Sequence, residues 1–355
     1  MNPETDKTTF RSSPSSPRWR GFNLPNLCFP PGDFRFADMV IQGYGRFFEN
    51  EFRWIAEWGF NFVRLPISYD WYVLDGDPEL IDEGKLAVID QAIEWGERYG
   101  LHVNLGLVHA PGYVNGSDYW LTPDRFDLWK DAAAAECFNA HWQMFARRYR
   151  GRSALQLSFC LLAEPARTDA DTYARIIRGA NNAVLAADPG RPILVEGLEY
   201  GSQPVPQLAD VGAAHCCRAY QPFHISHQLA WWVHMPVEPP AWPTPKPVQR
   251  TGWLVGPLDP DELRAWYQPW IDLAKQGVPR IHCGETGFWS RTPHHVGLAW
   301  IESVLTLFKE FGWSWALWNF TGAFGILDSG RTDVSYEHFH GHLLDRKYLQ
   351  LLQRY

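Results

Sequence analysis

The sequence predicts an α/β protein built on a single (β/α)8 TIM barrel. Short apolar runs alternate with amphipathic helical stretches, eight of these runs are typical of strands, and polar residues gather where the runs end. An open doubly wound sheet is less consistent with the sequence, because such sheets place a Gly-rich phosphate-binding turn after the first strand. The residues found there are Asn23-Leu24-Pro25-Asn26.

The expected strands are short and rich in β-branched and apolar residues, as strands of a parallel sheet buried on both faces are. They cover Arg20–Leu24, Asn61–Ile67, His102–His109, Leu155–Leu162, Pro192–Leu198, Ala214–Tyr220, Pro279–Gly284 and Trp313–Phe320.

The expected helices show apolar residues at helical spacing. They cover Phe52–Trp58, Leu86–Tyr99, Ala132–Tyr149, Tyr173–Ala187, Leu263–Lys275 and Val296–Phe311, with a final stretch near Tyr348–Leu352. The fifth barrel helix has the weakest pattern and is expected only at Val205–Ala209.

Two segments stand outside this alternation. Residues 1–18 are rich in Ser and Pro and are expected to form a disordered tail, which leaves 19–355 as the catalytic barrel. Phe223–Pro260 carries many Pro and Trp residues without periodicity, so it is expected to be an elaborated loop after strand six. Loops of that length are commonly functional.

Composition excludes several classes of function. Of the 355 residues, 32 are Lys or Arg and 40 are Asp or Glu, and no basic run occurs, so we expect no nucleic-acid partner. No apolar run is long enough to span a membrane, and the first residues lack the apolar core of a secretory signal. We therefore expect a cytoplasmic protein, or a secreted one if a signal has been removed.

The sequence patterns of several catalytic chemistries are absent. There is no CxxC pair, and no two of the conceivable ligands His102, His109, His215, His282 and Cys283 lie at i, i+4 spacing, so no metal site is expected. The G-x-S-x-G elbow of serine hydrolases is also absent. The six cysteines are expected to be free thiols. We expect no cofactor, and the oligomeric state stays open.

Two glutamates stand at the expected carboxyl ends of strands four and seven, where barrel enzymes place their reactive groups. Glu164 follows Leu162-Ala163, and Glu285 follows Cys283-Gly284. A pair of carboxyl groups across a barrel mouth suits glycoside hydrolysis, in which one protonates the leaving oxygen and the other attacks the anomeric carbon or activates water. The alternative is that one glutamate belongs to a buried ion network with Arg64 or Arg218.

Seven motifs in order, from about Arg20 to Asp328, resemble glycoside hydrolase family 5, a cellulase-like family of retaining β-glycosidases. They are RGFNLPN, FRWIAEWGFNFVRLPI, LHVNLGLVHAPGY, LQLSFCLLAEP, AYQPFHISHQ, IHCGETGFW and WSWALWNFTGAFGILD. The resemblance implies that Glu164 is the general acid/base and Glu285 the nucleophile. It implies a carbohydrate or glycoside substrate and a substrate-binding surface that includes Arg64, His109, Ala163, Arg218, Tyr220, Trp289 and Trp318.

Within that surface, the resemblance gives three residues separate roles. Tyr220 would hydrogen-bond to the nucleophile, Arg64 would be its electrostatic neighbour, and Trp318 would be the platform under the sugar at the cleavage point.

The sequence also departs from the family pattern. Ala163 occupies the position of an Asn that binds the sugar 2-hydroxyl, Val108 occupies that of a strand-three His, with His109 one residue later, and Arg218 replaces the His of an H-x-Y motif. These departures favour a β-glucoside, an oligosaccharide or a modified glycoside over plain cellulose. Arg218 either grips an acidic group of the substrate or forms a salt bridge to a neighbouring carboxylate.

Two other functions remain open. One is a catalytically weak or inactive sugar-binding pseudoenzyme. The other is an intracellular glycosidase or transglycosidase acting on a small specialised glycoside. If the altered residues set substrate choice, restoring Asn at position 163 and His at position 218 should increase activity on simple glucosides.

Overall fold

The computed structural model describes residues 17–28, 43–114, 127–233, 238–245 and 256–355. Most of the expected N-terminal tail, and two parts of the long loop after strand six, lie outside the described residues. Among the described residues, no helix combines the length and the apolar character needed to cross a bilayer.

Eight parallel strands close into a barrel, so the predicted fold class is confirmed. The strands are β1 (Arg20–Asn23), β2 (Phe62–Ser68), β5 (His102–Ala110), β7 (Leu157–Cys160), β8 (Ile193–Glu196), β9 (Ala214–Ala219), β10 (Ile281–Thr286) and β11 (Ser314–Leu317). Each pairs with its neighbours along the chain, and β11 pairs with β1 to close the ring. Each of the eight predicted strand segments overlaps one of these strands.

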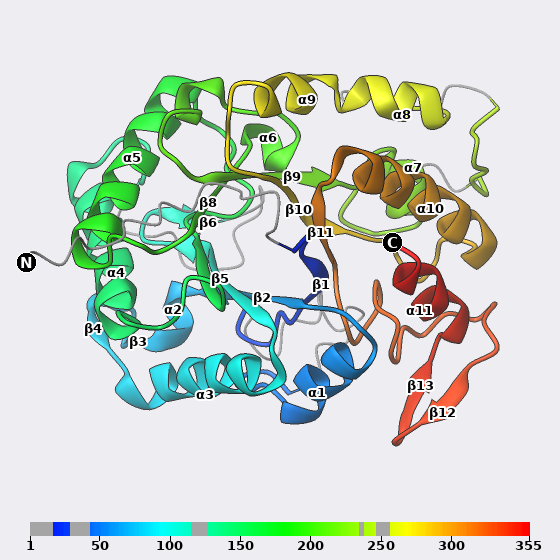
Figure 1. The fold of residues 1–355 in the computed structure, drawn as a ribbon, viewed down its shortest axis with the longest axis horizontal. Coiled ribbons are helices and arrows are strands. Elements are labelled where there is room, and N and C mark those ends of the chain that lie inside the picture. The colour runs from blue at the N-terminus through cyan, green and yellow to red at the C-terminus, as the bar shows by residue number, and fades with distance from the viewer. Residues whose placement is uncertain (1–16, 29–42, 115–126, 234–237, 246–255) are drawn as a thin grey trace, which may run out of the picture.

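The longer helices surround the barrel, as Figure 1 shows. They are α1 (Glu49–Glu57), α3 (Glu83–Tyr99), α4 (Ala132–Arg148), α5 (Ala170–Ala187), α8 (Pro260–Trp266), α9 (Gln268–Ala274), α10 (His294–Phe311) and α11 (Arg346–Gln353). In α3 the side chain of Asp82 caps the N-terminus by accepting the Lys85 N–H. Leu86, Ile89 and Ile93, at helical spacing, form its buried face.

Short helices and two-stranded hairpins lie in the connections between the barrel elements. Short helices are α2 (Tyr69–Tyr72), α6 (Leu198–Gly201) and α7 (Phe223–Ser226), and the hairpins are β3 (Val73–Leu74) with β4 (Asp77–Ile81), and β12 (Glu337–Phe339) with β13 (His342–Leu344). Strand β6 (Tyr113–Val114) runs antiparallel to the end of β5. The β12–β13 hairpin packs on α1, where the rings of Trp54 and Phe339 lie 5.1 Å apart.

Two of the predicted helices differ from the structure. The stretch Leu263–Lys275 is two helices, α8 and α9, because Pro269 in the first turn of α9 has no N–H with which to continue the preceding helix. The weak fifth helix is only a single 3₁₀ turn, Pro206–Leu208.

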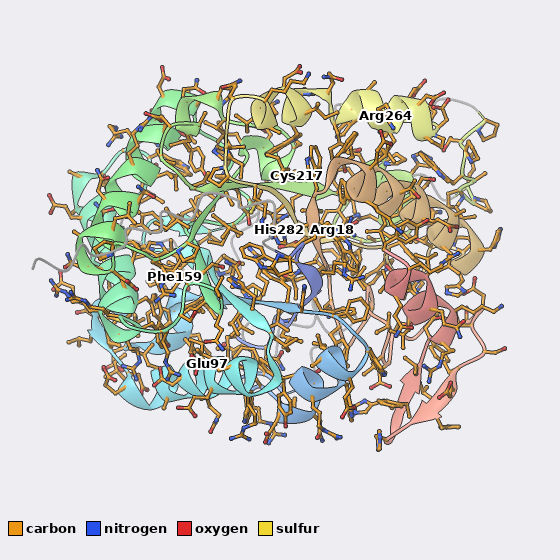
Figure 2. All side chains as sticks on the ribbon, viewed as in Figure 1. Arg18, Glu97, Phe159, Cys217, Arg264 and His282 are labelled. Carbon is orange, nitrogen blue, oxygen red and sulfur yellow. The ribbon has the colours of Figure 1, made fainter. Side chains whose placement is uncertain are left out.

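Side chains alternate between the inside of the barrel and the surrounding helices. Cys216 belongs to a small cluster that strands of the barrel share, whereas its neighbour Cys217 packs in the main core with the helices. All six cysteines are free thiols in the structure. In Figure 2 His282 of β10 lies within the ring of strands, while Glu97 and Arg264 lie on the outer helices.

One buried carboxyl group couples the stability of this fold to pH. Glu51 of α1 accepts a hydrogen bond from the Thr321 hydroxyl at 2.9 Å, and no partner of its other oxygen is found among the described residues. Burial raises the pKa of Glu51 to about 7. Because the folded state binds this proton more tightly than the unfolded chain does, stability should fall as pH rises from about 4.5 to 7.

We therefore expect Glu51→Gln to raise the free energy of unfolding relative to the unchanged protein at pH 8, by up to a few kcal/mol, and to give a smaller gain at pH 5. Urea unfolding at both values measures the difference. Glu57→Gln, on the exposed side of the same helix, is the control and should show little dependence on pH. An equal effect of Glu51→Gln at both pH values would contradict the prediction.

Candidate active site

Five charged side chains meet near the carboxyl ends of the barrel strands. They are Arg64 of β2, Glu164 just after β7, Glu196 at the end of β8, Arg218 of β9 and Glu285 of β10. Four of the five had been singled out from the sequence. Parallel strands direct these ends to one edge of the barrel, which explains how residues far apart in the sequence come together.

Both oxygens of Glu285 are held in place. Arg64 Nη1 donates to Oε1 at 2.7 Å, Arg218 Nη2 lies 2.9 Å from the same oxygen, and the Tyr220 hydroxyl donates to Oε2 at 3.1 Å. Burial, followed by the charges of Glu285 and Glu164, raises the pKa of Tyr220 well above its ordinary value. Tyr220 therefore stays protonated and able to donate to Glu285.

Glu164 is fixed mainly through its backbone. Its φ of 49° is left-handed, a conformation that costs a non-glycine residue about 1–2 kcal/mol. Its N–H donates to Glu196 Oε2 at 2.8 Å, and its carbonyl accepts from the Tyr113 hydroxyl at 2.7 Å. The Glu164 side chain is 19% exposed, against 8% for Glu285, so it is the more accessible of the two.

Glu196 is a site residue that sequence reasoning missed. Its side chain is fully buried, and it accepts hydrogen bonds from Arg64 Nη2 at 3.1 Å and Arg218 Nη2 at 2.8 Å. The signal was present in the sequence, because Glu196 is the only charged residue in the run Ile193–Gly197 at the end of a strand. It carries the same pattern as Glu164 and Glu285.

Arg218 contacts all three glutamates. Besides Glu196 and Glu285, its Nε donates to Glu164 Oε1 at 3.3 Å, and the side chain is only 3% exposed. Burial alone would lower its pKa, but the three carboxylates outweigh that effect and raise it. Of the two interpretations of Arg218, the structure shows the salt bridge.

Two of the three positions that depart from the family pattern lie in an apolar cluster. Ala163 and Val108 belong to it together with Tyr220, Trp289 and Trp318, and the cluster is completed by Cys28, Ala230, Val233, Ala323 and Phe324. Ala163 is fully buried and offers no hydrogen-bonding side chain where the family pattern has an amide.

His109 makes different contacts. Its Nδ1 lies 3.1 Å from the Ser68 hydroxyl, which in turn donates to Asp70 at 3.1 Å. Burial lowers the pKa of His109 to about 4, so the ring is neutral near pH 7. Val108, rather than His109, packs with Ala163 in the apolar cluster. No group of three or more His, Cys, Asp or Glu suited to a metal ion occurs in the described parts of the chain.

A (β/α)8 barrel whose strand ends bring together glutamates, arginines and a tyrosine is the architecture of a glycoside hydrolase. The comparisons with known proteins agree. The model of the family Cellulase (glycosyl hydrolase family 5) matches residues 44–323, so this chain belongs to glycosyl hydrolase family 5. Enzymes of this family are retaining O-glycosyl hydrolases.

Similar proteins cover most of the chain. Endoglucanase C of Acetivibrio thermocellus is 26% identical over 314 residues, which are 81% of this chain and 88% of that protein. Cellodextrinase A of Ruminococcus flavefaciens is 25% identical over 276 residues, 74% of this chain and 75% of that protein. A solved structure of a glycoside hydrolase is 33% identical, with a TM-score of 0.84, and the match covers 95% of this chain and 99% of that one.

Proposed function

We propose that this protein hydrolyses a β-glycoside with Glu285 as nucleophile and Glu164 as general acid/base. The observation that carries the proposal is that one guanidinium group, that of Arg218, contacts both carboxylates, at 2.9 Å and 3.3 Å. Two carboxylates that share a guanidinium lie close together. This favours the retaining spacing of about 5–5.5 Å over the about 6.5–9.5 Å of inverting enzymes.

The contacts suit these roles. Arg64 and Tyr220 hold the Glu285 carboxylate, whose oxygen attacks the anomeric carbon as the glycosidic C–O bond breaks. The more exposed Glu164 gives its proton to the departing oxygen, then takes a proton from the water that releases the sugar from Glu285. The mechanism requires no cofactor.

The substrate we propose is a β-glucoside, a β-linked oligosaccharide or a glycoside modified at C2, rather than plain cellulose. The names of the relatives, endoglucanase and cellodextrinase, support β-glucan chemistry. Ala163 and Val108 lie in an apolar cluster and cannot donate to a sugar hydroxyl. Because three carboxylates already occupy Arg218, an acidic sugar gains no support from that residue.

A panel of chromogenic β-glycosides and soluble oligosaccharides, followed by mass spectrometry of the protein during turnover, tests this proposal. We expect hydrolysis of at least one β-glycoside with retention of configuration and a glycosyl adduct on Glu285. Binding without turnover on the whole panel would favour the sugar-binding pseudoenzyme. Sugar transfer to an added alcohol in preference to water would favour a transglycosidase.

The acid/base role of Glu164 predicts an effect that depends on the leaving group. Glu164→Ala should lower kcat/KM about 10²–10⁴-fold for an alkyl β-glycoside, whose alkoxide needs a proton to depart. A dinitrophenyl glycoside needs no proton, so its glycosylation step should change little. Tyr113→Phe, which removes a hydroxyl bonded to the backbone of Glu164 but leaves the carboxyl group, is the control. Equal losses on both substrates with Glu164→Ala would remove Glu164 from the acid/base role.

A further inference from the structure

Glu196 is a third carboxylate at the centre of the site, and the mechanism above gives it no role. Its Oε2 accepts the backbone N–H of Glu164, and its Oε1 accepts from Arg64, Arg218 and the Cys160 thiol. The side chain has no exposed surface. A buried carboxylate that binds the backbone of one proposed catalytic residue and the arginines of the other is placed to influence both.

The surrounding chain makes room for Arg218. A Cβ atom on Gly284 would lie 2.2 Å from Arg218 Nη1, and one on Gly201 would lie 2.5 Å from Arg218 Cγ. A larger residue at position 284 would therefore clash with the guanidinium of Arg218, and one at position 201 would clash with the aliphatic part of the same side chain. Glu196 supplies its counter-charge from the adjacent strand, β8. The Glu196–Arg218 pair thus depends on the absence of side chains at Gly201 and Gly284.

The charges of the site explain what the pair does. With all groups ionised, the two arginines and three glutamates carry a net charge of −1, and a single proton makes the cluster neutral. Without Glu196 and Arg218, the remaining groups also carry −1. The Glu196–Arg218 pair therefore adds one positive and one negative charge and leaves the net charge of the cluster at −1. With or without the pair, binding of one proton makes the cluster neutral.

We propose that Glu196 is a positioning residue for Glu164. It holds the left-handed backbone of Glu164, and it offsets the charge of Arg218, which would otherwise keep the Glu164 carboxyl group ionised. This inference rests on the proposed acid/base role of Glu164. A guanidinium 3.3 Å from a carboxylate favours the ionised form, and a nearby anion favours the protonated form, so the two members of the pair act on Glu164 in opposite directions.

The loss of the proton from Glu164 can be measured separately from the titration of its neighbours. Among the described residues, the charged and titratable groups around it include Glu196, Arg218, Tyr220, Glu285, Arg64, Tyr113 and Cys28. Burial raises the pKa of Tyr220, of Tyr113 and of Cys28. Those three groups therefore stay neutral near pH 7, and the alkaline limb of kcat/KM reports the loss of the Glu164 proton.

The test is the alkaline limb of the pH profile of kcat/KM on an alkyl β-glycoside. Glu196→Gln should move this limb to lower pH by about one unit, since it removes an anion near Glu164, whereas Arg218→Gln should move it to higher pH. The double variant should return the limb close to its original position. Glu196→Asp keeps the charge and should keep the limb, even if the shorter side chain lowers kcat.

A second measurement separates positioning from general damage. Glu196→Gln should lower kcat/KM more for the alkyl glycoside than for the dinitrophenyl glycoside, as Glu164→Ala does, with a smaller ratio. The control is Asp345→Asn, because Asp345 is also fully buried and accepts a backbone N–H, that of Tyr348, at the start of α11. This control should lower stability without moving the limb or the leaving-group ratio.

The outcomes distinguish the inference from the function on which it rests. If Glu164→Ala shows no leaving-group dependence, the proposed acid/base role fails. If Glu164→Ala shows it but Glu196→Gln leaves both the limb and the ratio unchanged, the role of Glu196 is overturned. Shifts in the same direction for Glu196→Gln and Arg218→Gln would also overturn it.

Discussion

Replacing Glu285 with Gln is expected to lower kcat by about 10⁴-fold or more, which corresponds to at least about 5.4 kcal/mol of lost transition-state stabilisation. The amide keeps the size of the side chain but cannot attack the anomeric carbon, so the glycosyl intermediate cannot form. Steady-state kinetics on an activated glycoside measure the loss. Mass spectrometry should find no adduct in the variant. Binding of substrate should persist, because the apolar cluster with Trp289 and Trp318 is unchanged.

The control for Glu285→Gln is Tyr220→Phe. It removes the hydroxyl that donates to Glu285 Oε2 and leaves the carboxylate with its two arginine contacts. We expect a much smaller loss, because a single hydrogen bond to a charged group contributes about 1.5–3 kcal/mol. Comparable losses in the two variants, with an adduct still formed by Glu285→Gln, would assign the nucleophile to another residue.

The fold was predictable because its signals are local and repeated. Each barrel strand is a short apolar run. A run such as Phe62–Ser68, which is buried at every position, can be recognised from its own residues without knowledge of what packs against it. Element ends were less predictable, because they depend on single residues. Pro269 divides a helix whose apolar periodicity continues across the break, and periodicity alone does not reveal the division.

The glutamates of the site were predictable for a related reason. A charged residue that follows an apolar run at the end of a parallel strand marks the barrel mouth, and Glu164 and Glu285 both show this pattern. This pattern does not show which residue forms a salt bridge with each charged side chain. Arg218 was open between a substrate contact and a salt bridge, since only the fold places Glu196, 22 residues earlier in the chain, against its guanidinium.

The positions that depart from the family pattern illustrate the same limit. Ala163 and Val108 are recognisable as departures because polar residues are expected there, but the sequence does not show what replaces the lost contacts. The structure shows that both pack with tryptophans in one apolar cluster. It also shows that His109, one residue away from the expected position, turns to Ser68. A shift of one residue along a strand is enough to reverse the direction of a side chain.

The ion network changes what is expected from restoring the family residue at position 218. Arg218→His alone should destabilise the fold by about 3–5 kcal/mol, because it leaves the fully buried Glu196 with Arg64 as its remaining salt-bridge partner. That is a large part of the about 5–15 kcal/mol that stabilises a typical domain. Urea unfolding at pH 7 measures the change.

Adding Glu196→Gln to Arg218→His should recover most of the lost stability, because it removes the charge that Arg218 had balanced. An equally unstable double variant would contradict a coupled pair. The same reasoning applies to activity on simple glucosides. Asn at position 163 and His at position 218 can restore the family's contacts only if position 196 is neutral as well, since an unbalanced Glu196 disturbs the backbone of Glu164 that it binds. We therefore expect the gain on simple glucosides from the triple variant Ala163→Asn, Glu196→Gln and Arg218→His, and a loss from the double variant that retains Glu196.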